Sequence, residues 1–220
     1  MYHYTPGTFC TKYAFQTALK RAAELHLKHI VVASCSGKSA LLFLNHTSDF
    51  EVVCVSHQVG YFKQGETEMD PETRKRLTNA GIKILTSTHL LAGIDRACRI
   101  KFGGVYPAEL VASTLRMFGQ GVKVCVEISV MALDAGLIPF GTEIVALGGS
   151  GNGLDSAVVL TPAHSQNFFD TKIKEVSSPG EFHPEALSEP DVNLSAHPAP
   201  IIQPQDESPF ASVRTASVRV

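Results

Sequence analysis

Short runs of β-branched residues alternate with segments of helical periodicity, and this alternation constrains the fold more than any other feature of the sequence. The runs are apolar at consecutive positions, which is typical of strands buried on both faces. They lie at residues 30–34, 51–56, 82–85, 143–147 and 157–160, with a further edge strand expected within 168–176. Strands that alternate with helices over short connections predict an α/β fold with a single, doubly wound, mostly parallel sheet of about five strands and helices on both faces.

The segments between these runs carry the signals of helices. Apolar spacing or cap residues predict helices at 13–28, 37–46, 71–79, 107–118 and 122–135, and a short helix within 90–104. Residues 122–135 fit both an alternating strand and one face of a helix. Fourteen residues are long for a strand, so we expect a buried helix there.

A change in composition near residue 177 divides the chain into two parts. Seven of the 12 prolines lie at position 179 or beyond, and six acidic residues there face only two arginines. Such a segment cannot bury enough apolar surface to order itself. We therefore predict an α/β domain at residues 1–176 and an extended or loosely ordered, proline-rich acidic tail at 177–220.

The composition argues against several classes of protein. The net charge of −2 and the scattered Lys and Arg residues predict no binding to nucleic acid. No apolar run reaches membrane-spanning length, and the N-terminus lacks the pattern of a signal peptide, so we expect no membrane association. Five cysteines without C-x-x-C spacing indicate reduced thiols, and we therefore expect a cytoplasmic protein. No Cys/His spacing indicates a metal site, and none is expected.

The turn at residues 36–39, Ser-Gly-Lys-Ser, follows the first predicted strand and opens the next predicted helix. Unpaired N–H groups and partial positive charge at a helix start favour a bound phosphate. The lysine adds a full charge, and the two serines add hydroxyl donors. The turn is not a Walker A loop, because Val32 stands where that motif needs glycine. The alternative is an ordinary strand–turn–helix whose serine and glycine only cap the helix.

Four polar segments follow predicted strands, and we expect them to gather at one edge of the sheet. In open α/β sheets, ligands bind beyond the carboxyl ends of the strands. The four segments are residues 34–39, 56–62, 86–89 and 148–153. Their convergence predicts a ligand pocket at that edge.

Several of these segments resemble a known family. Residues 29–40 look like the effector-binding segment of the pyruvate kinase C-terminal domain, where a strand runs into a Ser/Thr-Gly-basic-Ser-Ala turn that holds a sugar phosphate. Residues 140–149 resemble the final strand of that domain and the loop that closes over the same effector. The whole chain looks more like the standalone pyruvate kinase C-terminal-like proteins of prokaryotes. The matching pieces are residues 36–39, 85–89, 104–109, 148–151 and 155–160.

This resemblance covers roughly residues 8–178. It implies the pyruvate kinase C-terminal fold, and it implies bound flavin mononucleotide (FMN) in at least some members. The catalytic barrel of pyruvate kinase, with its metal and nucleotide sites, is not matched. We therefore expect no pyruvate kinase activity.

Roles for individual residues follow from this implied ligand and from their chemistry. The 36–39 turn would take the phosphate, and hydroxyls at strand ends would bond the ribityl chain. Two histidines would edge the ring or neutralise the phosphate, and the glycine-rich loop would close over the ligand. The candidate binding residues are Ser34, Ser36, Gly37, Lys38, Ser39, Ser56, His57, Thr88, His89, Glu127, Gly148, Gly149, Ser150, Gly151, Asn152 and Asp155.

Some of these residues can also be explained by a structural role without any ligand. His57 and His89 also fit ordinary loop histidines. Glu127 lies in an apolar helix and is either paired internally or faces the pocket, because a buried unpaired carboxylate is costly. Cys54 precedes His57 by three residues, which suggests a thiol nucleophile, but nothing in the sequence marks a third, orienting group.

Three functions therefore stay open, and no catalytic residue is assigned. The first is an FMN-binding protein, with a flavin-dependent oxidoreductase as one form of it. The second is a non-catalytic sensor of a phosphorylated metabolite. The third is a phosphate-ester enzyme that uses His57 or His89 as acid or base. A small phosphorylated ligand is the expected partner, and a homo-oligomer is plausible for so small an α/β domain.

Overall fold

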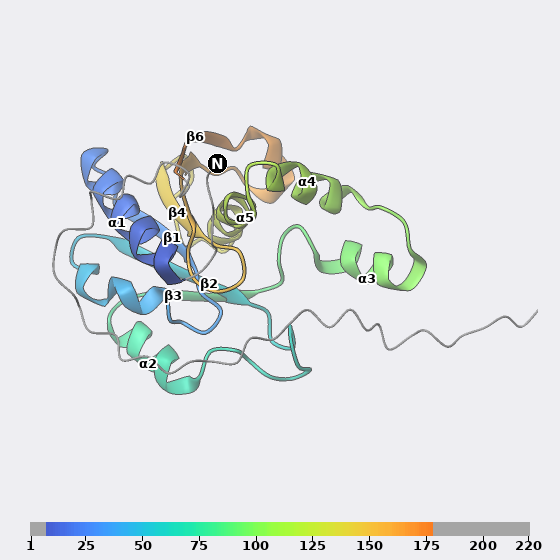
Figure 1. Cartoon of the computed structure of the whole chain (residues 1–220), viewed down its shortest axis with the longest axis horizontal. Helices are drawn as coiled ribbons and strands as arrows, with labels where there is room; N and C mark the ends of the chain where they lie inside the picture. Colours follow the sequence, from blue (N-terminus) through green and yellow to red (C-terminus); the bar gives the residue numbers. More distant parts are fainter. Residues whose placement is uncertain (1–7, 178–220) are drawn as a thin grey trace, which may run out of the picture. The chain divides into compact units, whose positions relative to one another are not determined.

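A computed structural model describes residues 8–177 of the chain, which form one six-stranded mixed sheet with helices on both faces (Figure 1). The strand order is β3-β2-β1-β4-β5-β6. Strands β1 to β4 run parallel, and β5 runs antiparallel to both of its neighbours. The strands are β1 (His29–Ala33), β2 (Glu51–His57), β3 (Lys83–Ser87), β4 (Ile144–Gly148), β5 (Ser156–Thr161) and β6 (Lys172–Ser177).

Within residues 8–177, seven helical segments connect or flank these strands. They are α1 (Thr8–Glu24), η1 (Ala40–His46), α2 (Pro71–Asn79), α3 (Gly93–Phe102), α4 (Pro107–Arg116), α5 (Gln120–Asp134) and η2 (Ser165–Asp170). The two segments labelled η are 3₁₀ helices. The predicted α/β class is confirmed, and the ambiguous segment 122–135 is a helix. The edge strand begins at Lys172 rather than 168, because η2 occupies the preceding residues.

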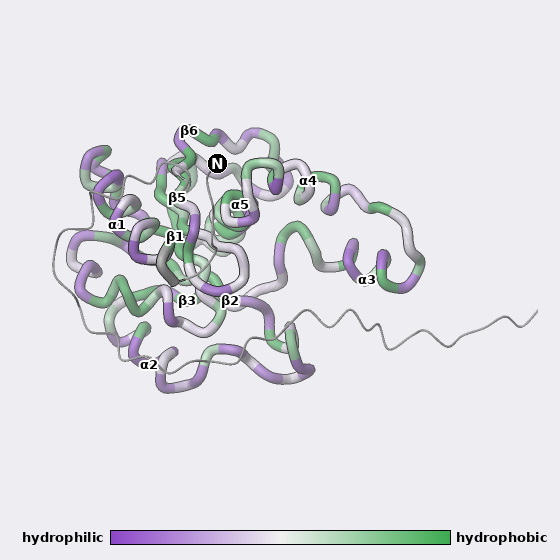
Figure 2. The backbone as a smooth tube through the Cα atoms, in the orientation of Figure 1, coloured by the Kyte–Doolittle hydropathy of each residue, from purple (hydrophilic) through white to green (hydrophobic). Residues whose placement is uncertain are grey.

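The core has two layers, one on each side of the sheet. Side chains alternate along each strand, so Ile30 and Val32 pack with α1, η1 and α2, whereas Val31 packs with α5 on the opposite face. Figure 1 shows α1 and α5 on opposite sides of the strands, and Figure 2 shows how hydrophobic residues gather in the strands and in α5. Twelve of the 15 residues of α5 are buried, so this helix is the central element of its layer.

The α3–α4 pair differs from the other helices because it contributes little to this core. No residue of α3 is buried, and only Ala112 is buried in α4. Asp95 ties the two helices together, since its Oδ2 accepts the Ala108 N–H at the start of α4 at 2.9 Å. Large apolar side chains exposed on this pair and its adjoining loops are Ile94, Ile100, Phe102, Val105, Leu110, Met117 and Phe118.

The boundary predicted between domain and tail falls at the end of the described residues. Ser177 is the last residue of β6, and the prediction for 178–220 lies outside the described part of the chain. Among residues 8–177, no helix combines the length and the apolar character needed to cross a membrane.

Candidate functional site

The carboxyl ends of the four parallel strands lie at one edge of the sheet, and the predicted site segments begin there. The register pairs Ala33 with Val55, His57 with Ser87, and Val32 with Leu147, so these strands end nearly level. The turn after β1, the loops after β2 and β3, and the glycine-rich loop after β4 therefore start from the same edge. We call it the carboxyl edge.

The 36–39 turn is held in place by the residue that ends β1. The Ser34 Oγ accepts the backbone N–H groups of Ser39 and Ala40 at 3.1 and 3.4 Å. Two of the amides that were expected to face a phosphate therefore already have an acceptor, and the segment that follows is a 3₁₀ helix rather than an α-helix. Ser36 and Lys38 are exposed, so their side chains remain open to a ligand.

Gly37 is required by packing as well as by backbone shape. Its φ is +85°, in the left-handed region that favours glycine. A Cβ at this position would lie 2.4 Å from Cγ2 of Thr73 on α2. The turn is consequently pressed against α2, and the residue is buried.

Ser56, predicted to bond a ligand hydroxyl, lies within a small hydrogen-bond network at the end of β2. Its Oγ lies 2.9 Å from Oγ1 of Thr86 on β3. The Thr86 Oγ1 also accepts an N–H from Arg74 of α2 at 2.7 Å. With only 5% of Ser56 exposed, this hydroxyl joins two strands at the edge.

An aromatic and histidine cluster stands beside this network. The His57 and Tyr61 rings stack with centroids 3.9 Å apart, and His89 meets His57 edge-on at 4.7 Å. The Nδ1 of His57 lies 2.5 Å from Oε1 of Glu68, which fixes the orientation of the imidazole. The guanidinium of Arg96 lies over Tyr61, 5.6 Å from the ring centroid. Two predicted residues, His57 and His89, are therefore brought into contact, and three further residues join them.

The surroundings of His89 keep its imidazole uncharged. Burial lowers the pKa of His89 to about 4, an effect that the nearby Glu127 carboxylate opposes. At neutral pH the His89 imidazole is therefore uncharged, with one nitrogen as donor and the other as acceptor. Thr88, the neighbouring candidate, is exposed at the start of the same loop, and its Cγ2 would lie 3.5 Å from a Cβ at Gly93.

Glu127 is paired inside the protein, which is the first of the two interpretations that the sequence left open. Its Oε2 forms a salt bridge with Lys123 one turn earlier, and its Oε1 accepts the Leu91 N–H at 2.8 Å. The side chains are 2% and 7% exposed, so this is a buried ion pair. The pair anchors the loop after β3 to α5.

The glycine-rich loop is braced from within by Asp155. Its Oδ2 accepts the Ser150 N–H and its Oδ1 accepts the Ser156 hydroxyl, both at 2.8 Å. Asp155 is 4% exposed, so the carboxylate stabilises the loop and does not point into solvent. Gly148 and Gly149 are closely packed, since a Cβ on either would lie within 2.4 Å of a backbone oxygen. Gly151 and Asn152 are exposed at the tip.

Cys35, His57 and Glu68 offer ligand atoms that all lie within 4.8 Å of one another, a grouping that sequence spacing does not indicate. The distance of 2.5 Å between His57 and Glu68 fits a hydrogen bond. Two ligands of one zinc ion stand farther apart, roughly 3.3 Å for tetrahedral geometry with bonds near 2 Å. Burial also raises the pKa of the Cys35 thiol to about 11, so the neutral thiol prevails at pH 7. The His57 and Glu68 atoms are therefore arranged as a hydrogen-bonded pair.

The suggested thiol nucleophile, Cys54, is also unsuited to that role. Burial raises its pKa to about 12, and its Sγ donates to the Ser34 carbonyl oxygen at 3.5 Å. A neutral, enclosed thiol is a poor nucleophile.

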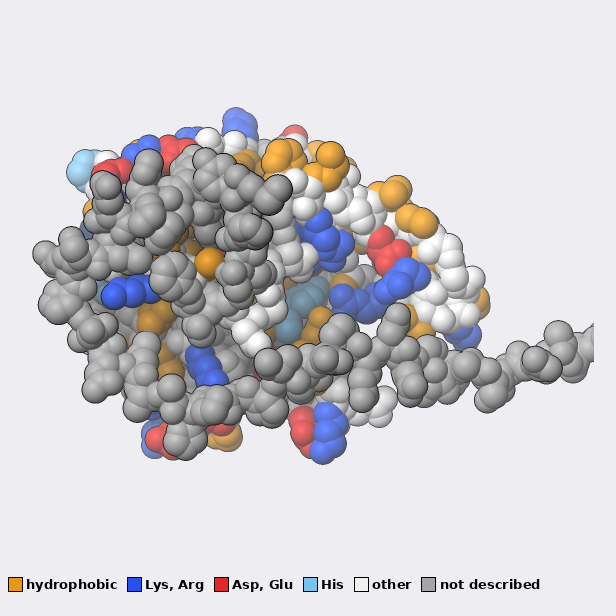
Figure 3. All heavy atoms as spheres, viewed as in Figure 1, with side chains coloured by type: hydrophobic (Ala, Val, Ile, Leu, Met, Phe, Trp, Pro, Cys, Tyr) orange, Lys and Arg blue, Asp and Glu red, His pale blue; other side chains and the backbone are white. Residues whose placement is uncertain are grey.

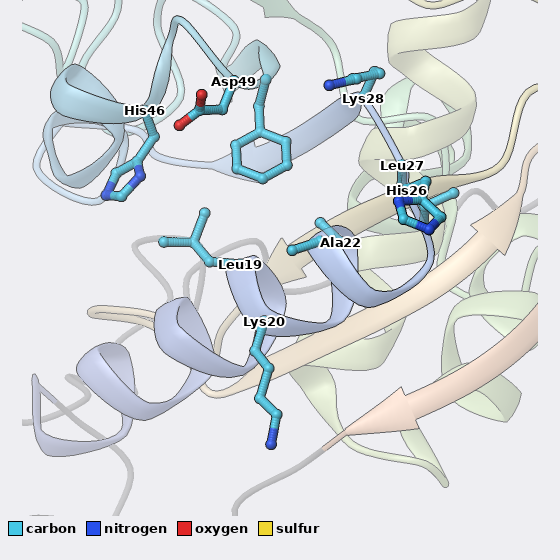
Figure 4. Close-up of a pocket in the computed structure, with 10 residues that line it drawn as sticks. Leu19, Lys20, Ala22, His26, Leu27, Lys28, His46 and Asp49 are labelled. Atoms are coloured by element: carbon cyan, nitrogen blue, oxygen red, sulfur yellow. The ribbon is translucent and has the colours of Figure 1, made fainter.

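Two clefts of the described residues lie at different places in the fold. The larger, about 500 Å³, lies between α1 and the residues that precede β1 and β2, at the amino edge of the sheet. Figure 4 shows Leu19 and Ala22 of α1 facing this cleft, with His46 and Asp49 on its other side, while Lys20 points away. The second cleft, about 400 Å³, lies between α3 and α4 and includes Arg96.

Sequence reasoning missed four residues. Tyr61, Glu68 and Arg96 belong to the aromatic and histidine cluster, and Lys123 pairs with Glu127. Tyr61 lies in the loop after β2 that was already expected at the carboxyl edge. Glu68 and Arg96 reach the cluster through loop and helix positions that no periodic pattern marks. Lys123 stands one helical turn before Glu127, a spacing that favours an ion pair and was visible in the sequence.

The chain is similar to one known domain family and to several solved structures. A family model described as the pyruvate kinase alpha/beta domain matches residues 14–160. Similar solved structures include a pyruvate kinase of Cryptosporidium parvum, with 13% identity and a TM-score of 0.35, covering 76% of this chain and 22% of that one. The same organism's enzyme in complex with ADP matches with 14% identity and a TM-score of 0.35, covering 78% and 24%.

The present chain spans less than a quarter of the length of these enzymes. The matched segment of the family model, in contrast, extends from α1 to the end of β5 and covers more than half of the chain. The protein therefore belongs to the pyruvate kinase alpha/beta domain family.

Proposed function

We propose that the protein binds a small phosphorylated molecule with an aromatic ring, FMN in the first instance, at the carboxyl edge. The observation that carries the proposal is the shared edge: the 36–39 turn and the His57–Tyr61–His89 cluster follow adjacent parallel strands. The residues that could hold a phosphate therefore lie beside those that could hold a ring. Pyruvate kinase activity is not part of the proposal, because the match is confined to the alpha/beta domain.

The phosphate end of the ligand would meet the exposed side chains of the turn. Ser36 offers a hydroxyl and Lys38 a full positive charge. The amides of Ser39 and Ala40 are bonded to Ser34, so the contribution of the helix start is smaller than the sequence led us to expect. Affinity for the phosphate should therefore depend mainly on the two side chains.

The ring end would meet the aromatic cluster. Aromatic rings attract planar ligands by stacking, worth roughly 1–3 kcal/mol per base in nucleic-acid complexes. Because His57 stacks on Tyr61 and Arg96 lies over it, a ligand ring would take the place of one of these two contacts. Neutral His89 can donate or accept one hydrogen bond at a ring edge without adding charge. When bound, FMN would supply redox chemistry, and the residues of this chain would position it.

The test compares FMN with riboflavin, which has the same ring and ribityl chain but no phosphate. Titration of the full chain, followed by flavin fluorescence, should show FMN binding at least about tenfold more tightly, the effect of one or two charge-assisted hydrogen bonds. The double variant Ser36→Ala/Lys38→Ala should lose this preference while riboflavin affinity stays the same. Lys63→Ala, which removes an exposed lysine paired with Glu66 in a nearby loop, is the matched control and should change nothing. Equal affinities of FMN and riboflavin for the unmodified chain would remove the phosphate assignment.

A non-catalytic sensor of a phosphorylated metabolite is the second candidate, because the exposed turn needs no ring. Ribose 5-phosphate, which lacks the ring, separates the two. Binding as tight as that of FMN, together with indifference to Tyr61→Leu, would favour the sensor. A flavin protein should bind ribose 5-phosphate weakly and lose FMN affinity in Tyr61→Leu. An oxidoreductase additionally requires that a nicotinamide donor reduce the bound flavin.

A further inference from the structure

We propose that the cleft between α3 and α4 is a second binding site, which takes a small organic anion with two charged groups. The cleft holds about 400 Å³, within the range of small-molecule sites. Its lining carries three arginines and a single carboxylate. Figure 3 shows Lys or Arg side chains gathered on this side of the molecule.

The charges of the lining are only partly compensated. Arg99 forms a salt bridge with Glu109, which neutralises one guanidinium. Arg116 uses its Nε to donate to Gln120 at 2.7 Å, so its charge is not balanced by that contact. Arg96 makes a cation–π contact with Tyr61, which likewise leaves its charge in place. Two guanidinium charges therefore face the cleft in excess of the carboxylate.

The cleft has a fixed frame despite the weak packing of α3 against the core. Asp95 accepts the Ala108 N–H and thereby joins α3 to the start of α4. Leu91, which lines the cleft, is bonded to the buried Glu127 on α5. Two arginines carried on such a frame can each form a paired, two-bond contact with a carboxylate or phosphate.

Arg96 connects this site to the carboxyl edge. It lines the cleft and at the same time lies over Tyr61, which stacks on His57. A small anion held by Arg96 would consequently lie next to the aromatic cluster. The cleft is thus placed to hold a second, anionic molecule beside a ring-bearing ligand. Binding of the anion in the cleft does not itself depend on flavin.

The experiment titrates succinate, inorganic phosphate and uncharged succinamide into the full chain by calorimetry. Saturable binding of succinate, without binding of succinamide, is the expected result. Phosphate is titrated into the Ser36→Ala/Lys38→Ala variant as well, so that binding at the 36–39 turn is not mistaken for binding in the cleft. Arg96→Gln and Arg116→Gln should each weaken binding about tenfold, the effect of one charged pair of hydrogen bonds. Arg76→Gln, on the exposed face of α2, is the matched control and should bind as the unmodified chain does.

Two further variants keep the result interpretable. Arg96→Lys retains the charge but not the two-bond fork, so it should bind with intermediate affinity. It is the variant to use if Arg96→Gln folds poorly. Ser36→Ala/Lys38→Ala should bind succinate normally, so a failure of the flavin proposal leaves this result unchanged. Absence of saturable binding, equal binding of succinamide, or full affinity in both glutamine variants would overturn the second site.

Discussion

The buried pair Lys123–Glu127 should be the most sensitive polar contact in the fold, and Lys123→Met tests this. The substitution leaves the Glu127 carboxylate, 2% exposed, without its cation. Breaking a buried pair by removing one partner costs about 3–5 kcal/mol. Because Leu91 still donates to Oε1, we expect the free energy of unfolding to fall by about 3 kcal/mol, the lower end of that range. For a domain of this size that corresponds to a fall in Tm of roughly 6–12 °C.

The assay is urea unfolding followed by circular dichroism, with extrapolation of the free energy of unfolding to water. Lys63→Met is the control, because that lysine and Glu66 are 76% and 59% exposed, and the loss there should stay below about 1 kcal/mol. The double variant Lys123→Met/Glu127→Gln removes both charges but keeps an acceptor for Leu91, and should recover part of the stability. If Lys123→Met costs no more than Lys63→Met, the buried pair does not hold the loop as argued.

Three further predictions concern the carboxyl edge. Gly37→Ala should lower the free energy of unfolding in urea by about 1–3 kcal/mol, since a Cβ there would lie 2.4 Å from a side-chain carbon of α2. Gly136→Ala, which has a similar φ and open space around it, is the control and should lower it less. Equal losses in the two variants would refute the clash. His89 has a folded-state pKa of about 4, below the usual 6.5. The unfolded chain then binds more protons between these values, so stability should fall as pH drops from 6.5 to 4, and His89→Gln should flatten that slope; an unchanged slope would contradict the burial of the ring. Asp155→Ala should cost about 1–3 kcal/mol and speed amide exchange in the loop that follows β4, whereas unaltered exchange would show that the loop needs no brace.

The fold could be predicted from the sequence because its signals are local. Consecutive β-branched residues identify buried parallel strands, and the length of 122–135 distinguishes a helix from a strand. The helix expected at 71–79 also has local cap residues, because the Asp70 carboxylate accepts the Thr73 N–H and Pro71 takes the first position. The antiparallel direction of β5 was not predicted, because strand direction follows from the path of the connecting chain rather than from composition.

The candidate site could be predicted only to the level of its segments. Parallel strands must end at a common edge, so the positions of the 36–39 turn and of His57 followed from the fold class. The hydrogen-bond partners did not, because the contact of Ser34 with the turn and of Glu68 with His57 depends on loop paths. Such loops leave no periodic pattern in the sequence. The same applies to Arg96, which reaches the cluster from an amphipathic helix with no buried residue.

Chemical-shift mapping with FMN on isotope-labelled full-length protein tests the central claim most directly. The account predicts that the amides most affected belong to the carboxyl edge: residues 36–39, the loop that carries His57 and Tyr61, and the exposed tip of the glycine-rich loop. Amide shifts that cluster instead around the larger cleft at the amino edge, lined by Leu19 and Phe50, would contradict it.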